Sequence, residues 1–279
     1  MRDRIGRVLN FMLGGLALYG VAVGGLYVMQ DSLIFPRHNT AEPKYPLPDA
    51  SEKIVLTTPD SEQITGHLVR ALGPSKGLLI GFSGNAWNAD DCLVFLAHRV
   101  KDYDIAVFHY RGYAPSGGAP SQTALFDDAT LIYDTLVQGM APERVVAVGF
   151  SIGSGVASYI ATTRDVAGLV LVTPFDSIQA IAAKRHPWAP VRTLLKHPFL
   201  SDQYIKGVAE PVAIIRASHD RVVPAAHTDA LAQIVPNLVY DETIPDSTHG
   251  SIYDKEEIDI ELVRALAAVH GASVGDNGI

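Results

Sequence analysis

The chain has 279 residues, of which 48% are hydrophobic and 19% are charged. This composition fits one large globular α/β domain or two small ones, and it excludes a disordered or collagen-like chain. A single cysteine, Cys92, excludes an internal disulfide framework and a cysteine-rich zinc site. The formal net charge is −8, and the acidic excess lies after residue 37. Because such a body would repel a phosphate backbone, nucleic-acid binding is not expected.

The first predicted element is a membrane-spanning helix over residues 8–29, since this stretch is apolar and contains no charged side chain. A helix of that length rises roughly 33 Å, which is enough to cross the hydrocarbon core of a bilayer. A cleaved signal peptide is the alternative, but its apolar region usually has only about 7–15 residues. The stretch here continues through Leu26, Tyr27, Val28 and Met29, which favours an uncleaved anchor.

The charges beside this helix predict its orientation. Residues 1–7 contain three arginines, whereas the next basic residue after the helix is Arg37. By the positive-inside tendency, the N-terminus should lie in the cytoplasm and the rest of the chain outside it, in the periplasm if the protein is bacterial. Gly20 and Gly24 form a GxxxG pair through which two anchors could pack, so a homodimer is one conceivable assembly.

A tether and a soluble domain are predicted after the anchor. Residues 30–50 form the tether, because four prolines and few apolar side chains lie in 36–50. The domain then covers residues 51–279. It begins with two β-rich stretches, 53–58 and 64–70, around a turn-like segment, and this pattern predicts a hairpin.

The rest of the domain alternates between short apolar runs and stretches with helical spacing of apolar residues. The apolar runs, which are typical of strands buried on both faces, are 77–82, 104–110, 144–150, 167–172, 211–217 and 238–244. The helical stretches are 89–101, 122–140, 154–164, 227–235 and 256–270. Alternating strands and helices build a mostly parallel sheet with helices on both faces, so the predicted fold class is α/β.

The motif GFSIG at residues 149–153 places Ser151 between a predicted strand and a predicted helix. A serine on a sharp strand-to-helix turn has a strained backbone and needs small residues two positions to either side, so the glycines have a mechanical role. The serine oxygen is then exposed at the carboxyl edge of the sheet. Ser151 is therefore the predicted nucleophile, and it requires a base and an orienting carboxylate.

Each of these two partners is predicted in a loop after a later strand. Asp220 follows 211–217, and His249 follows 238–244. In folds that carry such a nucleophile turn, the acid and then the histidine follow the serine in this order. Asp176, after an earlier apolar run, is the rival acid, because some hydrolases with this order place the carboxylate there.

An acyl-transfer serine also needs backbone N–H groups directed at the developing oxyanion. Ile152, the residue after the nucleophile, is predicted to supply one of them. The other is expected from the loop after 77–82, where Asn85 is the first candidate and Ala86 the second. An ordinary glycine turn ahead of a helix is the alternative interpretation of that loop.

With these motifs, residues 52–270 resemble the α/β-hydrolase superfamily of serine hydrolases, and in particular its single-pass membrane-anchored branch, which includes lipid and thioester hydrolases. Residues 110–121, YRGYAPSGGAPS, are similar to the branch's Tyr-Arg-Gly-Tyr-Gly-x-Ser-x-Gly-x-Pro, and 217–224, ASHDRVVP, are similar to its acid loop. The branch's His-Gly-Asn-Ala-Gly-Asn at the oxyanion loop here reads SGNAWN, from Ser83. The resemblance implies an α/β-hydrolase fold and hydrolysis of acyl esters or thioesters.

The segment 173–210 lies where such enzymes usually carry a lid. Its central part has four basic side chains and no acidic one, so it could face anionic headgroups or receive an anionic amphiphile. A solvated helical face is the alternative. Trp87, Tyr110 and Trp188 are the candidate residues of the substrate pocket, and Trp87 would place a large ring near the acyl group.

Other classes of function fit the sequence less well. The glycine-rich stretch 153–158 lacks the third glycine and the later acidic residue of a dinucleotide-binding fingerprint, and the histidines lack the spacing of a metal site. Neither a cofactor nor a metal is therefore expected. The predicted function is hydrolysis of esters or thioesters of lipid-like acyl groups. A peptidase or amidase with the same triad, and a non-catalytic membrane-tethered binding protein on the same fold, are the alternatives.

Overall fold

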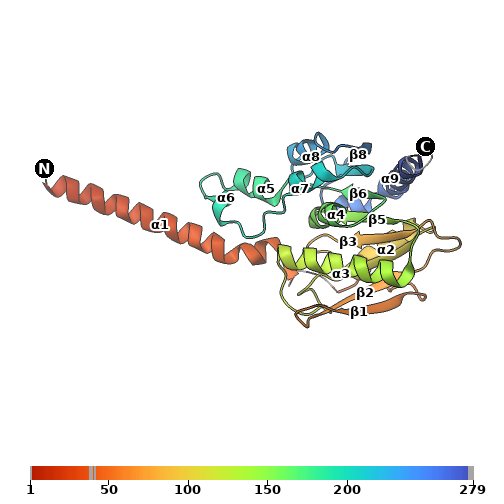
Figure 1. Cartoon of the computed structure of the whole chain (residues 1–279). Helices are drawn as coiled ribbons and strands as arrows, with labels where there is room; N and C mark the ends of the chain where they lie inside the picture. Colours follow the sequence, from red (N-terminus) through yellow and green to blue (C-terminus); the bar gives the residue numbers. More distant parts are fainter. Residues whose placement is uncertain (1, 38–39, 41, 276–279) are drawn as a thin grey trace.

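The computed structural model describes residues 2–37, 40 and 42–275 of the chain (Figure 1). A long helix, α1 (Arg2–Ile34), extends away from a body that contains all the other elements. Among the described residues, α1 is the one helix that is long and apolar enough to cross a membrane, and it includes the predicted span 8–29. It continues to Ile34, so the first turn of the predicted tether, 30–50, is helical.

The body is built on one eight-stranded sheet with the order β1-β2-β4-β3-β5-β6-β7-β8. β1 and β2 pair antiparallel as the predicted hairpin, β2 pairs antiparallel with β4, and the remaining neighbours are parallel. The strands are β1 (Glu52–Thr57), β2 (Gln63–Val69), β3 (Leu78–Phe82), β4 (Asp104–Phe108), β5 (Val145–Phe150), β6 (Gly168–Val172), β7 (Val212–Ala217) and β8 (Leu238–Ile244). Every residue of β3, β5 and β6 is buried, which explains why their sequences are continuous apolar runs.

Helices cover both faces of the sheet, as predicted. One core cluster joins the sheet to α2 (Ala89–Arg99) and α9 (Glu256–Gly275). The cluster on the other face contains side chains of α3 (Gln122–Met140), α4 (Ile152–Thr163) and α8 (Ala225–Ala232). Local capping explains where two of these helices begin, because Asn88 accepts a hydrogen bond from the Asp90 N–H and Ser121 accepts one from the Ala124 N–H.

Residues 173–210, called the cap below, follow β6 and contain three short α-helices, α5 (Ile178–Arg185), α6 (Val191–Leu194) and α7 (Ser201–Tyr204), and one 3-10 turn, η2 (Ile205–Gly207). The lid was predicted over the same residues. None of the side chains of α5 or α6 is fully buried, so this part of the cap is a thin layer over the body. Figure 1 shows α5 and α6 on the same side of the body as α1.

Candidate active site

Ser151 stands on a sharp turn between β5 and α4. Its φ of 52° and ψ of −118° lie in a region that L residues rarely adopt, so the turn is strained. A Cβ atom on Gly153 would lie 2.1 Å from the carbonyl oxygen of Phe82, and a Cβ atom on Gly149 would lie 2.5 Å from the oxygen of Gly153. Glycine at both positions therefore lets β3, β5 and α4 approach closely enough to hold the serine in this conformation.

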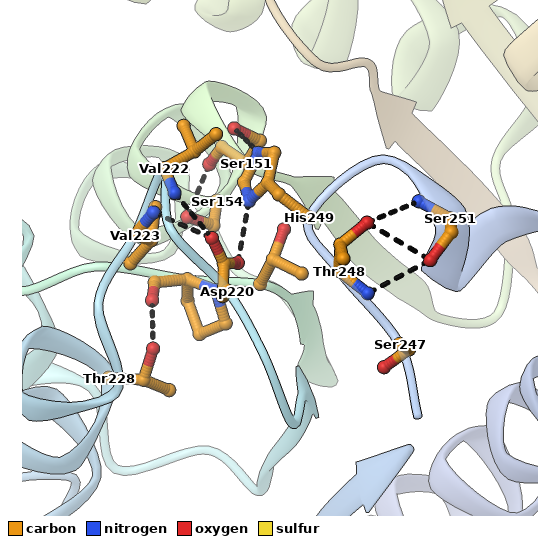
Figure 2. Close-up of polar contacts among 12 residues, drawn as sticks. Ser151, Ser154, Asp220, Val222, Val223, Thr228, Ser247, Thr248, His249 and Ser251 are labelled. Atoms are coloured by element: carbon orange, nitrogen blue, oxygen red, sulfur yellow. Dashed lines mark hydrogen bonds and ion pairs between the residues drawn. The ribbon is translucent and has the colours of Figure 1, made fainter. Parts of the chain in front are cut away.

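His249 bridges Ser151 and Asp220 (Figure 2). Its Nε2 lies 2.9 Å from Ser151 Oγ, and its Nδ1 lies 2.7 Å from Asp220 Oδ2. The Asp220 side chain is only 5% exposed, and its other oxygen accepts hydrogen bonds of 2.8 Å from the N–H groups of Val222 and Val223. The three side chains follow β5, β7 and β8, which end at the same edge of the parallel sheet. The structure thus brings the three residues proposed from the sequence into one hydrogen-bonded row.

Short hydrogen bonds within two loops fix the position of His249. The Thr248 N–H donates to Ser251 Oγ at 2.9 Å, and the Ser251 N–H donates to Thr248 Oγ1 at 3.2 Å (Figure 2). The Ser247 hydroxyl donates to the Ile244 carbonyl at 2.6 Å, and the Ser247 carbonyl accepts from the His219 N–H at 2.8 Å. Since His219 precedes Asp220, this last bond ties the loop of the acid to the loop of the histidine.

Asp176, the rival acid, has a different histidine as its partner. Its Oδ1 lies 2.8 Å from Nδ1 of His227 on α8 and also accepts a hydrogen bond of 2.6 Å from the Ser177 N–H. His249 instead contacts Asp220. The geometry therefore favours Asp220 as the orienting carboxylate, and Asp176 serves to connect the start of the cap to α8.

The loop between β3 and α2 lies beside the serine. A Cβ atom on Gly84 would be 3.8 Å from the Cβ of Ser151, and Asn85 lines the same two cavities as Ser151. The amide Nδ2 of Asn85 donates to the Ile34 carbonyl at the end of α1, 3.1 Å away. This bond directs the Asn85 side chain toward α1, and the predicted oxyanion contact of Asn85 is one from its backbone N–H. Ile152 opens α4, where the first N–H groups have no partner within the helix.

Tyr110, one of the three predicted pocket residues, lies elsewhere. It is buried in the core, and its hydroxyl donates to the Ser83 carbonyl oxygen at 2.9 Å. Burial raises the pKa of the Tyr110 hydroxyl, which keeps it protonated and able to donate. β4 ends before Tyr110, and the chain turns the ring under the loop after β3, so this residue supports that loop and is not among the described residues that line the cavities at Ser151.

The two predicted pocket tryptophans differ in position. Trp87 lines a cavity together with Ser151 and His249, and its ring packs against Phe150 with centroids 5.2 Å apart. Trp188, by contrast, lies between α5 and α6 of the cap and is 47% exposed, and it is not among the described residues that line the cavities at Ser151. The sequence could not show that the Trp188 ring lies outside these cavities, because no local sequence pattern determines how the cap folds over the body.

Ser151 lies between two cavities of different character. The apolar cavity has a volume of about 350 Å³. The other cavity, which Trp87 lines, has a volume of about 830 Å³ and is called the polar cavity below because its lining is the more polar of the two. From α1, the apolar cavity is lined by Val23, Leu26, Tyr27, Gln30, Leu33 and Ile34. From the cap, it is lined by Phe175, Ile178, Ile181, Ala182, Val191, Leu194 and Leu195, among others. Charged side chains in the polar cavity include Lys44, Arg99, Asp254 and Glu256.

The role of α1 in this site was missed by the sequence analysis, which gave the helix only an anchoring function. A uniformly apolar stretch has no distinct face, so its periodicity cannot show which side chains line a cavity. Gln30, the polar residue just after the span 8–29, is the signal that could have indicated a specific contact. Tyr253 was also missed, and its ring packs on Trp87 with centroids 4.8 Å apart.

A separate cluster, His67, Asp90 and His109, has side-chain geometry that could suit a metal ion, with the candidate ligand atoms all within 4.8 Å. Both imidazoles contact the same oxygen, Asp90 Oδ1, at 2.9 and 3.0 Å. Burial alone would raise the pKa of Asp90, but the hydrogen bonds and charges of the two histidines outweigh it and lower that pKa. None of the three residues lines a cavity at Ser151 in the part of the chain that the structure describes.

Comparison with known proteins identifies the family. A family model described as the alpha/beta hydrolase fold matches residues 77–205. The uncharacterized protein Rv2307c of Mycobacterium tuberculosis is 31% identical over 198 residues, which cover 67% of this chain and 70% of that protein. The chain belongs to the α/β-hydrolase family. In this α/β hydrolase, the matched region runs from β3 to α7 and so contains both the nucleophile turn and most of the cap.

Two further relatives differ in how much of this hydrolase they match. The uncharacterized membrane protein YNL320W of Saccharomyces cerevisiae is 28% identical over 246 residues, or 83% of this chain and 86% of that protein. The lysophosphatidylserine lipase ABHD12 of Danio rerio is 30% identical over 141 residues, or 44% of this chain and 37% of that protein. The α/β hydrolase described here is thus similar to the first over most of its length and to the second over less than half.

Proposed function

We propose that this α/β hydrolase is a membrane-anchored serine hydrolase that cleaves carboxylic esters or thioesters of lipid-like acyl groups. The observation that carries the proposal is the row of hydrogen bonds from Ser151 Oγ through His249 to Asp220. A neutral serine hydroxyl is a weak nucleophile, and a base 2.9 Å from it, oriented by a buried carboxylate, is the arrangement that activates it.

In the proposed reaction, His249 Nε2 accepts the Ser151 proton while Oγ attacks the substrate carbonyl carbon. Asp220 accepts a hydrogen bond from Nδ1–H and stabilises the imidazolium that forms. The Ile152 N–H and a backbone N–H of Asn85 or Ala86 stabilise the oxyanion of the tetrahedral intermediate. His249 then protonates the departing alcohol or thiol, and the acyl group stays on Ser151. Water activated by His249 attacks this acyl-enzyme, releases the carboxylic acid and restores the serine.

The preference for lipid-like acyl groups rests on the two cavities beside Ser151. The apolar cavity suits an acyl chain, and the polar cavity suits a hydrophilic leaving group. The name of the relative ABHD12, a lysophosphatidylserine lipase, is consistent with this division, although the similarity covers less than half of each chain. A peptidase or amidase would use the same three side chains, so only substrates can separate the two reactions.

The membrane anchoring and topology are part of the same proposal. The apolar helix α1 and the similarity to the membrane protein YNL320W support anchoring. The three arginines at the N-terminus favour a cytoplasmic N-terminus and an extracytoplasmic body. Reporters fused to each terminus test this orientation. A cytoplasmic C-terminus would overturn the proposed localisation and leave the proposed chemistry unchanged.

The experiment that tests the chemistry is fluorophosphonate labelling of the full chain in detergent, followed by hydrolysis of acyl esters, acyl thioesters and aminoacyl amides. We expect labelling of the wild type, loss of labelling in Ser151→Ala and hydrolysis of esters or thioesters in preference to amides. Ser158→Ala is the matched control, because Ser158 lies on the same helix and its hydroxyl donates to the Ser154 carbonyl within that helix. A folded wild type that is not labelled would favour the non-catalytic binding protein, and faster amide cleavage would favour the peptidase.

A further inference from the structure

One face of α1 is covered by the body of the protein. Val23, Leu26 and Ile34 are partly buried and Gln30 is 7% exposed, whereas the neighbouring Val28 is 74% exposed. The covered positions are spaced by three or four residues, so they lie on one face of the helix. All four line the apolar cavity that reaches Ser151. The helix α1 is therefore a wall of this cavity, in addition to its proposed role as a membrane anchor.

Polar contacts fix this wall in place at its C-terminal end. The Gln30 side chain accepts a hydrogen bond of 2.8 Å from the Lys196 N–H and donates one of 3.2 Å to the Leu194 carbonyl. The Asp31 carboxylate lies 3.1 Å from His197 Nε2. These bonds connect α1 to the cap segment that forms the opposite wall. Because Asn85 Nδ2 also bonds the Ile34 carbonyl, the end of α1 is tied to the loop beside the nucleophile.

The contact between α1 and the cap extends into the apolar stretch of the helix. The Tyr19 hydroxyl donates to the Trp188 carbonyl at 3.1 Å, and the two rings pack edge to face at 6.3 Å. From Tyr19 to Ile34, its last residue, the helix rises roughly 22 Å. The loop between α5 and α6 therefore reaches the part of α1 that is predicted to lie within the bilayer, ten residues before the end of the span 8–29.

We infer that α1 and the cap together form a binding site for the acyl chain of a membrane lipid, with Val23 and Leu26 of the anchor limiting the length of chain that fits. This inference rests on the proposed function, because the chain must belong to an acyl group that reacts at Ser151. The cavity is within the size range of ligand sites, roughly 300–1,000 Å³. Among its described lining residues, the charged side chain is Arg185, which is exposed at the end of α5. Apart from Gln30, Asn85, Ser151 and His186, the remaining lining is made of apolar residues and of Tyr27, and it suits an alkyl chain.

The test compares short-chain and long-chain alkyl fluorophosphonates on the full chain reconstituted in phosphatidylcholine vesicles. The ratio of the two labelling rates at Ser151 is the readout. Leu26→Trp fills the cavity from α1, and Ala182→Phe fills it from the cap. Val28→Trp is the matched control, since it adds the same ring to the same helix at a position that does not line the cavity. We expect the ratio of long-chain to short-chain labelling to fall about tenfold in the first two variants and to stay within about twofold in the control.

The outcomes separate this inference from the proposed function. If the short-chain probe labels the wild type and both cavity-filling variants keep the ratio of the control, the acyl site is not formed by α1 and the inference is overturned. An equal loss in Val28→Trp would also overturn it, because the effect would then come from the membrane helix in general. If the short-chain probe does not label folded wild type, the proposed function fails and the inference falls with it.

Discussion

The carboxyl edge of the sheet and the wall formed by α1 and the cap meet at Ser151, but different contacts hold them together. At the edge, three side chains follow β5, β7 and β8, and bonds within short loops fix them. The wall depends on side-chain bonds between residues 164 to 166 positions apart, such as those of Gln30. The cap helices are only four to eight residues long. Changes at the edge should therefore affect the chemistry for every substrate, and changes at the wall should affect which substrate is used.

The largest effect is expected at the edge from Ser151→Ala. Without the proposed nucleophile the proposed acyl-enzyme cannot form, and removal of a triad serine typically lowers the turnover number by about 10⁴-fold or more. The measurement is the initial rate of hydrolysis of a short-chain ester, relative to buffer alone. Ser158→Ala should retain most of the activity. Residual hydrolysis within tenfold of the wild type would mean that Ser151 is not the nucleophile.

The next prediction compares the two carboxylates that the sequence left as rivals. Asp220→Asn removes the charge that orients and stabilises His249, and we expect kcat to fall by about 10³- to 10⁴-fold. Asp176→Asn leaves His249 untouched, because Asp176 pairs with His227, and we expect less than about a tenfold change by the same reasoning. Steady-state kinetics of both variants are the measurement. A larger loss in Asp176→Asn would reverse the assignment of the acid.

A smaller effect is expected on stability from Gly153→Ala. Its Cβ would lie 2.1 Å from the carbonyl oxygen of Phe82, so β3 and α4 must separate. We expect a loss of about 1–3 kcal/mol in the free energy of unfolding, as is typical of overpacked sites. Thermal unfolding in detergent measures it. Gly139→Ala is the control, because nothing lies within 4 Å of its Cβ and alanine favours a helix, so its effect should be neutral or stabilising. Equal behaviour of the two variants would contradict the close-packing explanation.

The parts of the edge that could be predicted from the sequence are those with local causes. The buried strands appear as apolar runs, and the turn at Ser151 needs its glycines, so both are visible in the chain itself. The order of serine, acid and histidine then gave Asp220 and His249 as candidates. The choice between Asp220 and Asp176 depended on which carboxylate reaches His249, and only the arrangement of the loops after β6 and β7 provides that information.

The parts that could not be predicted depend on distant contacts. Tyr110 lies in a motif rich in small residues, but the burial of its ring under Ser83 follows from the packing of β3 against β4. The sequence also does not show which face of α1 lines the cavity, because all faces of a uniformly apolar helix are equally suited to be covered. The helix continues past the predicted end at residue 29 for a similar reason, since the Asn85 side chain bonds the Ile34 carbonyl and the cap bonds the Gln30 side chain.

The smallest effect is expected at the wall from Gln30→Ala. This change removes the bonds to Lys196 and Leu194 and leaves two backbone groups of the cap without that partner, which should cost about 1 kcal/mol locally. Hydrogen exchange of the Lys196 amide should then be roughly fivefold faster. Ser32→Ala is the control, because Ser32 is exposed on the same helix. This substitution should leave the exchange rate of the Lys196 amide unchanged. If the Lys196 amide exchanges at the wild-type rate in Gln30→Ala, the cap does not depend on α1 for its position. The distinction between a rigid edge and a wall that α1 supports would then have to be abandoned.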